Sequence, residues 1–145
     1  MTSCMTAKQH VDYWLKLAAE DMAVMRSNLR AKHRTYSLFF GHLALEKMLK
    51  ALCAAKRIQV IKEHNLYRLA NRAGLILDTL QTSQLTTITG FNIAARYNDY
   101  RLQFHKQCTP TFTKHWVGII NDWYKYLKPI VKAERKNLPR NCPIV

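Results

Sequence analysis

The chain has 145 residues, of which 48% are hydrophobic, and this length favours a single domain with a real core that needs no metal or disulfide staples. Its 23 Lys and Arg against 9 Asp and Glu give a net charge of +14, which favours RNA or DNA, an acidic protein or an anionic lipid surface as partners. The charge alone does not distinguish between these partners, and a high net charge also keeps a small protein soluble.

The cysteine pattern and the hydropathy exclude several classes of protein. The four cysteines are widely scattered, without a CxxC pair or zinc-finger spacing: Cys4, Cys53, Cys108 and Cys142. We therefore expect free thiols, a reducing compartment, no metal site and no cofactor. The start, MTSCMTAKQH, lacks the apolar run of a signal peptide, and no stretch approaches the roughly 18 apolar residues of a membrane helix. These features predict a cytoplasmic protein without membrane contact.

Two long helices are predicted at the start of the chain. Apolar residues recur every three or four positions from Ala7 to about Lys32, and again from Tyr36 to Lys56. The connection over residues 31–35 is short, which predicts that the two helices are antiparallel neighbours. The second helix, YSLFFGHLALEKMLKALCAAK, combines a wide apolar face with a narrow polar stripe.

Shorter elements are predicted to follow. Asn65 is a suitable N-cap for a short helix closed by Gly74, and His64 directly before it either turns toward a site or helps to cap the turn. Asp78 offers a start signal for another helix, with a kink or break expected at Gly90.

The end of the chain combines an irregular segment with a long helix. Residues 96–108, RYNDYRLQFHKQC, show no clean period and predict a functional or mobile loop, or an irregular helix start. Thr109 and Pro110 are suitable N-cap and first residues of a last helix that reaches Pro129 and continues, kinked, to Asn137. The sum is an all-α, up-and-down helical bundle with a four-helix core plus short extra helices. It forms one domain over residues 1–137, followed by a flexible tail over 138–145.

Three motifs in this order resemble the HEPN domain family: HLALEKMLKAL (42–52), HNLYRLA (64–70) and AARYNDY (94–100). The resemblance covers roughly residues 12–128. It implies a helical bundle that often forms homodimers. It also implies a minimal nucleotidyltransferase as partner, encoded beside it and frequently paired with it as toxin and antitoxin.

In the ribonuclease branch of the family, an Arg is followed after four to six residues by a His near the start of the last long helix. Two such pairs meet across the dimer and cleave RNA without metal, because His transfers protons near neutral pH and Arg stabilises phosphate charge. Here eight residues separate Arg96 from His105 and three separate Arg101 from His105, so neither pair fits. The position of a Tyr that the partner modifies in some relatives is Gln107. Enzymatic activity therefore stays open, and the spacing argues against it.

The polar stripe of the second helix is the first candidate site. His42, Glu46 and Lys50 stand four residues apart and can face a groove between helices, where Glu46 would orient His42 or pair with Lys50. The alternative is an ordinary ion pair between residues four apart, which stabilises a helix only weakly.

The aromatic and basic segment before the last helix is the second candidate. Arg96, Arg101 and Asp99, with Tyr97 and Tyr100, form a candidate patch for nucleotide or phosphate, because Arg holds phosphate with two parallel hydrogen bonds and tyrosine stacks on bases. In the alternative, Asp99 pairs with an Arg to pin the loop and the tyrosines pack on the bundle.

Basic residues form the third group: Lys47, Lys56, Arg57, Lys62, Lys125, Lys128, Lys132, Arg135 and Lys136. They form either a solvated surface or a phosphate-binding face. The sequence thus predicts a nucleotide- or RNA-binding bundle that acts with a nucleotidyltransferase partner. One alternative is a metal-independent endoribonuclease using His105, the acid/base candidate, with Arg96 or Arg101. The other is a protein-interaction module with no nucleic-acid role.

Overall fold

A computed structural model describes residues 4–145, and this part of the chain contains six α-helices and no β-strand. The predicted all-α class is confirmed. The helices are α1 (Ala7–Arg30), α2 (Arg34–Ala55), α3 (Leu66–Arg72), α4 (Thr79–Arg96), α5 (Asn98–Gln107) and α6 (Pro110–Lys136).

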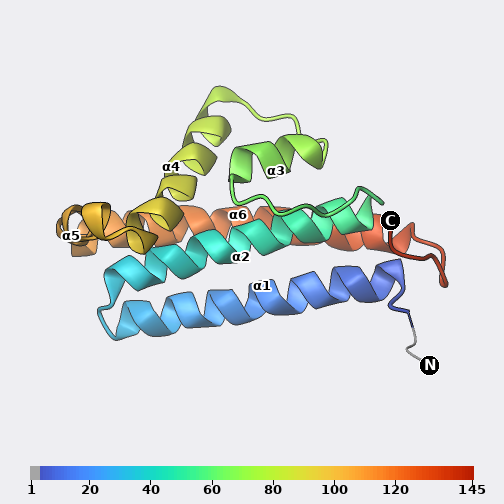
Figure 1. Ribbon diagram of the computed structural model, residues 1–145, viewed down its shortest axis with the longest axis horizontal. Coiled ribbons are helices and arrows are strands. Elements are labelled where there is room, and N and C mark those ends of the chain that lie inside the picture. Colours follow the sequence, from blue (N-terminus) through green and yellow to red (C-terminus); the bar gives the residue numbers. More distant parts are fainter. Residues whose placement is uncertain (1–3) are drawn as a thin grey trace.

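Helix α2 is the centre of the bundle. It is antiparallel to α1, whereas α6 runs along it in the same direction because α3, α4 and α5 make the return (Figure 1). Helices α3 and α4 cover one side of α2, and α5 lies at the end of the bundle where α2 begins (Figure 1). All five other helices contact α2. It is therefore surrounded, and residues on every face of it are buried.

Side-chain caps fix where the helices begin, largely as predicted. Asn65 accepts from a backbone N–H of the first turn of α3, Asp78 forms a capping box at α4, and Thr109 caps α6 with Pro110 as its first residue. Gly74, with φ of +80°, lies directly after α3, where a left-handed conformation ends the helix.

The structure corrects two predictions for the middle of the chain: the break at Gly90 is absent, and of the two alternatives for residues 96–108 the loop is wrong. Helix α4 passes through Gly90 without a break, because Ile88 and Phe91 are buried on either side of the glycine and hold the helix to the bundle. Residues 96–108 are not a loop: only Tyr97 separates α4 from the regular helix α5. Phe104 is the buried residue of α5, and its ring stacks on Phe91 with centroids 5.5 Å apart. Because α5 buries a single side chain, its sequence shows no apolar period.

The C-terminal segment lies against the beginning of α1. Leu138 and Cys142 are buried, and the backbone N–H of Ala7 donates to the carbonyl of Cys142 at 2.7 Å. An isolated antiparallel bridge joins Thr6 and Pro143. Residues 138–145, expected from the sequence to form a flexible tail, are thus placed on the bundle by apolar burial and backbone pairing.

Gly41 lies where α2 packs tightly against side chains of α1 and α6. A Cβ atom on Gly41 would lie 2.6 Å from Ile120 Cδ1 in α6 and 3.0 Å from Met25 Sδ in α1, whereas one on Gly90 would have no neighbour within 4 Å. We expect Gly41→Leu to lower the free energy of unfolding by about 1–3 kcal/mol through overpacking. Gly90→Leu is the matched control and should raise it by roughly 0.5–1 kcal/mol through helix propensity. Urea denaturation of both variants measures this, and equal stabilisation by both would contradict close packing at Gly41.

Candidate phosphate-binding site

The polar stripe of α2 lies in the interior. His42 is 0% exposed, Glu46 5% and Lys50 7%, because other helices surround α2. Buried polar and charged groups need partners. The stripe therefore does not line an open groove itself.

Glu46 is the centre of a small buried network. Its Oε2 lies 3.2 Å from Lys50 Nζ and its Oε1 lies 2.8 Å from Nδ1 of His64, in the segment between α2 and α3. The Lys50 ammonium also lies 5.6 Å from the centre of the Trp14 ring. The structure thus contains the Glu46–Lys50 pair, but Glu46 orients His64 and not His42.

His42 holds the same segment through its backbone. Its Nε2 lies 2.8 Å from the carbonyl oxygen of His64, and since a carbonyl only accepts, Nε2 is the donor. Burial lowers the pKa of His42, so the ring stays neutral with an unprotonated Nδ1. That Nδ1 has no hydrogen-bond partner among residues 4–145. His42 is thus a buried anchor for the segment that carries His64.

His64 itself reaches the surface. Its side chain is 51% exposed and lines a pocket of about 280 Å³ together with Asn92, Arg96 and Tyr97 from the end of α4. Because Glu46 occupies Nδ1, the other ring nitrogen, Nε2, is left without a partner among the described residues. An imidazole and an exposed guanidinium therefore share one pocket.

A carboxylate also lines this pocket, but its oxygens are engaged. Glu63 Oε1 accepts from the backbone N–H groups of His64 at 3.1 Å and Asn65 at 3.0 Å, and its Oε2 lies 3.7 Å from Arg68 Nη1. The hydrogen bond from the Asn65 backbone is the main cause that lowers the pKa of Glu63. This carboxylate stays ionised, holds the turn before α3 and shares its charge with Arg68, which does not line the pocket.

The predicted patch over α5 is divided between two places. Arg96 belongs to the His64 pocket, whereas Arg101 and His105 line a separate pocket of about 320 Å³ with Thr35 and Tyr36. Arg101 Nη2 donates to the hydroxyl of Tyr36 at 3.2 Å, and its guanidinium lies over that ring. His105 Nδ1 lies 3.5 Å from Thr35 Oγ1.

The remaining residues of that patch point to solvent. Asp99 is exposed and forms no ion pair within residues 4–145, so it does not pin an arginine. Tyr97 is 59% exposed and Tyr100 56%, so neither is packed into the bundle.

Several basic residues serve the fold. Lys47 pairs with Asp21 of α1, and Lys56 donates to the carbonyl of Ala73 at 2.7 Å. Arg135 holds Asp12 through two hydrogen bonds of 2.7 and 2.8 Å. These three therefore contribute less to a free phosphate-binding face than the sequence suggested.

The fold and this pocket together describe a helical-bundle domain with a surface pocket that an imidazole and a guanidinium line. A family model of the HEPN domain matches residues 11–122, and the chain therefore belongs to the HEPN domain family. Comparison with curated proteins and with solved structures gave no significant match. Among the described helices, none is both long and apolar enough to cross a membrane. No group of three or more metal-ligating side chains gathers within residues 4–145.

The neutral state of buried His42 predicts a pH dependence of stability. The pKa of His42 in the folded state is below the usual 6.5, so its contribution to the free energy of unfolding is complete above pH 6.5. Below pH 6.5 the unfolded chain takes up a proton at this histidine before the folded protein does, and the contribution is lost. The loss is at most about 1.4 kcal/mol per pH unit. His42→Gln keeps a donor for the His64 carbonyl but cannot titrate, so we expect a shallower fall of the free energy of unfolding from pH 6.5 to 5. Exposed His115→Gln is the control, and equal slopes for His42→Gln and wild type would refute the assignment.

Proposed function

We propose that this HEPN-family protein is a nucleotide- or RNA-binding module whose phosphate site is the pocket of His64 and Arg96. The observation that supports it is the convergence of the two side chains on one pocket, with His64 held from behind by Glu46. The Arg96 guanidinium supplies a planar pair of donors for phosphate oxygens, and Nε2 of His64 donates a further hydrogen bond when protonated.

The buried stripe has a positioning role in this proposal. Glu46 fixes the ring of His64, Lys50 balances the charge of Glu46, and His42 fixes the backbone of His64. Tyr97 lies on the rim with 59% of its surface exposed and offers a ring on which a base can stack. The net charge of +14 would bring polyanions to this surface over a longer range.

Binding of single-stranded RNA should depend on Arg96. We expect Arg96→Ala to weaken the binding of a short fluorescent RNA about tenfold. The slope of log K against log salt should also become shallower by about 0.7, which is the value for one lost phosphate contact with a single strand. Fluorescence anisotropy over a salt series measures both. Arg26→Ala, which removes an exposed arginine of α1, is the matched control. Equal weakening by both variants would mean that charge acts without a site at Arg96.

The ribonuclease alternative has one observation in its favour. Arg101 and His105 line the same pocket from adjacent turns of α5, so a phosphate and a proton-transfer group could meet there, whereas Arg96 lines another pocket. RNA from the binding samples, incubated in EDTA and run on a gel, separates the two proposals. Intact RNA supports binding alone, and products that disappear in His105→Ala support the enzyme.

Within the same proposal, the protein forms a homodimer and acts with a minimal nucleotidyltransferase, in the manner of a toxin–antitoxin pair. Family membership supports both the dimer and the partner. Two exposed apolar side chains also support a protein interface, Ile93 at the His64 pocket and Leu102 at the Arg101 pocket. The third possibility, an acidic protein that meets the basic surface without any nucleic acid, predicts tight binding of such a partner and no response to RNA.

Dimerisation through α5 can be tested with two equally exposed leucines. Leu102 is 66% exposed on α5, and Leu80 is 67% exposed at the start of α4. Light scattering should give twice the 17.0 kDa chain mass for wild type and for Leu80→Glu, and the chain mass for Leu102→Glu. A charge in an apolar interface is unfavourable, which is the reason for the difference. A wild-type monomer, or a dimer that survives Leu102→Glu, would exclude this interface.

A further inference from the structure

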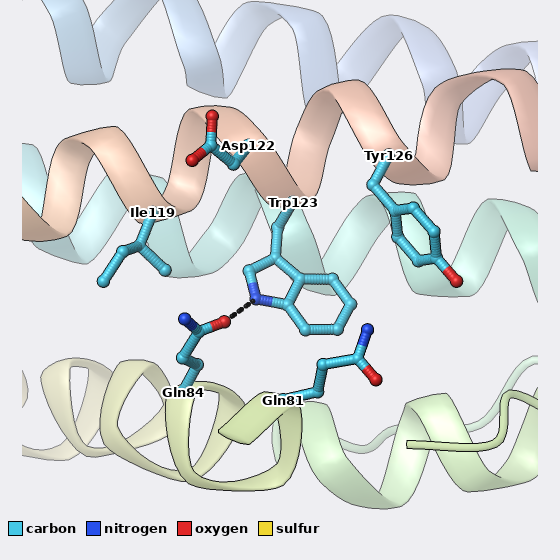
Figure 2. Close-up of a pocket in the computed structure, with 6 residues that line it drawn as sticks. All are labelled: Gln81, Gln84, Ile119, Asp122, Trp123 and Tyr126. Atoms are coloured by element: carbon cyan, nitrogen blue, oxygen red, sulfur yellow. Dashed lines mark hydrogen bonds between the residues drawn. The ribbon is translucent and has the colours of Figure 1, made fainter. Parts of the chain in front are cut away.

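A third pocket, of about 180 Å³, lies between α4 and α6 near the beginning of α4 (Figure 2). Gln81 and Gln84 line it from α4, and Ile119, Asp122, Trp123 and Tyr126 line it from α6. It shares no lining residue with the His64 pocket, which lies at the other end of α4. None of the candidate residues from the sequence belongs to it.

The chemistry of the neighbours fixes the orientation of both glutamine amides. Gln84 Oε1 accepts from the indole N–H of Trp123 at 2.9 Å, and Gln81 Oε1 accepts from the backbone N–H of Asp78 at 3.1 Å. Both neighbours are donors only, so the oxygen of each amide must face them. Each NH₂ group is left without a partner among the described residues. The fold itself uses neither NH₂ donor, and the two groups lie on opposite sides of the Trp123 ring (Figure 2).

Two aromatic rings and one aliphatic side chain form part of the pocket wall. The rings of Trp123 and Tyr126 meet edge to face, with centroids 5.7 Å apart and planes at 82°. Tyr126 is 47% exposed, so its ring is accessible, and Ile119 closes the opposite side (Figure 2). Asp122 is exposed and places a carboxylate at the rim. A planar ligand with acceptor atoms fits these walls, and N–H groups on its outer edge would find the carboxylate.

We propose that this pocket binds a nucleobase and prefers guanine. Guanine carries adjacent acceptors at O6 and N7 for a glutamine NH₂ group, and its N1–H and N2–H₂ groups match a carboxylate. Adenine offers the carboxylate only one amino group. Uracil places carbonyl oxygens on both sides of its single N–H, where a carboxylate repels them. The pocket volume suits one base, and the exposed ring of Tyr126 contributes stacking.

The base can belong to a free nucleotide or to single-stranded RNA, since both present the same edge. The site is independent of the His64–Arg96 pocket, so it stands if the proposed phosphate site is wrong. Neither ligand source requires a chemical reaction at this pocket.

Three conservative substitutions test the proposal without removing the structural hydrogen bonds. Gln84→Glu and Gln81→Glu keep an oxygen for the Trp123 indole and the Asp78 backbone, but they replace each NH₂ by an acceptor. Asp122→Asn replaces the rim acceptor by a donor. Gln103→Glu, at an exposed position of α5, is the matched control for the charge change.

The readout is the indole N–H signal of Trp123 in ¹H–¹⁵N NMR spectra, assigned by its loss in Trp123→Phe. We expect GMP to shift this signal with a Kd about tenfold lower than UMP or CMP and lower than AMP, because a good base-edge contact is worth about a factor of ten. Gln84→Glu and Gln81→Glu should each weaken the binding of GMP about tenfold. Asp122→Asn should remove the preference for GMP over AMP. Gln103→Glu should leave the titration unchanged.

Short single-stranded RNAs with and without guanine distinguish the ligand sources. A shift with GMP alone indicates a free nucleotide, and a shift only with guanine-containing RNA indicates a base within a strand. Both outcomes support the pocket. An unchanged signal with every ligand, or equal shifts with all four nucleotides or with inorganic phosphate, would overturn it.

Discussion

The burial of α2 by all the other helices is the constraint on which the rest of the structure depends. A helix that is surrounded cannot keep a polar stripe in solvent, so His42, Glu46 and Lys50 enter the interior, where an unpaired charge is strongly unfavourable. The network around Glu46 is the consequence. Its carboxylate neutralises Lys50 on one side and takes a hydrogen bond from His64 on the other.

This network links the core to the surface. The segment between α2 and α3 has no regular structure of its own, yet His42 holds its backbone and Glu46 holds the His64 ring. The exposed nitrogen of His64 therefore occupies a position determined by two buried side chains of a rigid helix. Preorganisation of this kind lowers the entropic cost of binding, because the imidazole does not have to be immobilised by the ligand.

The sequence predicted most of the helices because their signals are local. Capping residues such as Asn65, Asp78 and Thr109 act on the next turn, and the apolar periods of α1 and α6 extend over several turns. Helix α5 could not be predicted in this way, since one buried phenylalanine makes no period. Gly90 was misjudged for the opposite reason, because buried neighbours outweigh the low helix propensity of one glycine.

The composition of the candidate site depends on contacts that sequence spacing does not encode. Glu46 and His64 are 18 positions apart and meet only because the chain turns back after α2. Arg96 and Arg101 are close in sequence, but Tyr97 between their helices has an extended backbone, with φ of −100° and ψ of 125°. This one residue breaks the rotation of the helix, so positions on α4 and α5 no longer share a face, and the two arginines line different pockets.

The geometry of α4 also limits how the two proposed sites can act together. Gln81 and Arg96 are 15 residues apart on one continuous helix, which corresponds to about 22 Å along its axis. A mononucleotide cannot bridge that distance, so it would occupy one pocket and leave the other free. A single strand of several nucleotides could place a base between α4 and α6 and a phosphate beside Arg96. Occupation of both pockets by one molecule would therefore favour RNA over a free nucleotide, because linked sites raise the effective concentration of the second contact.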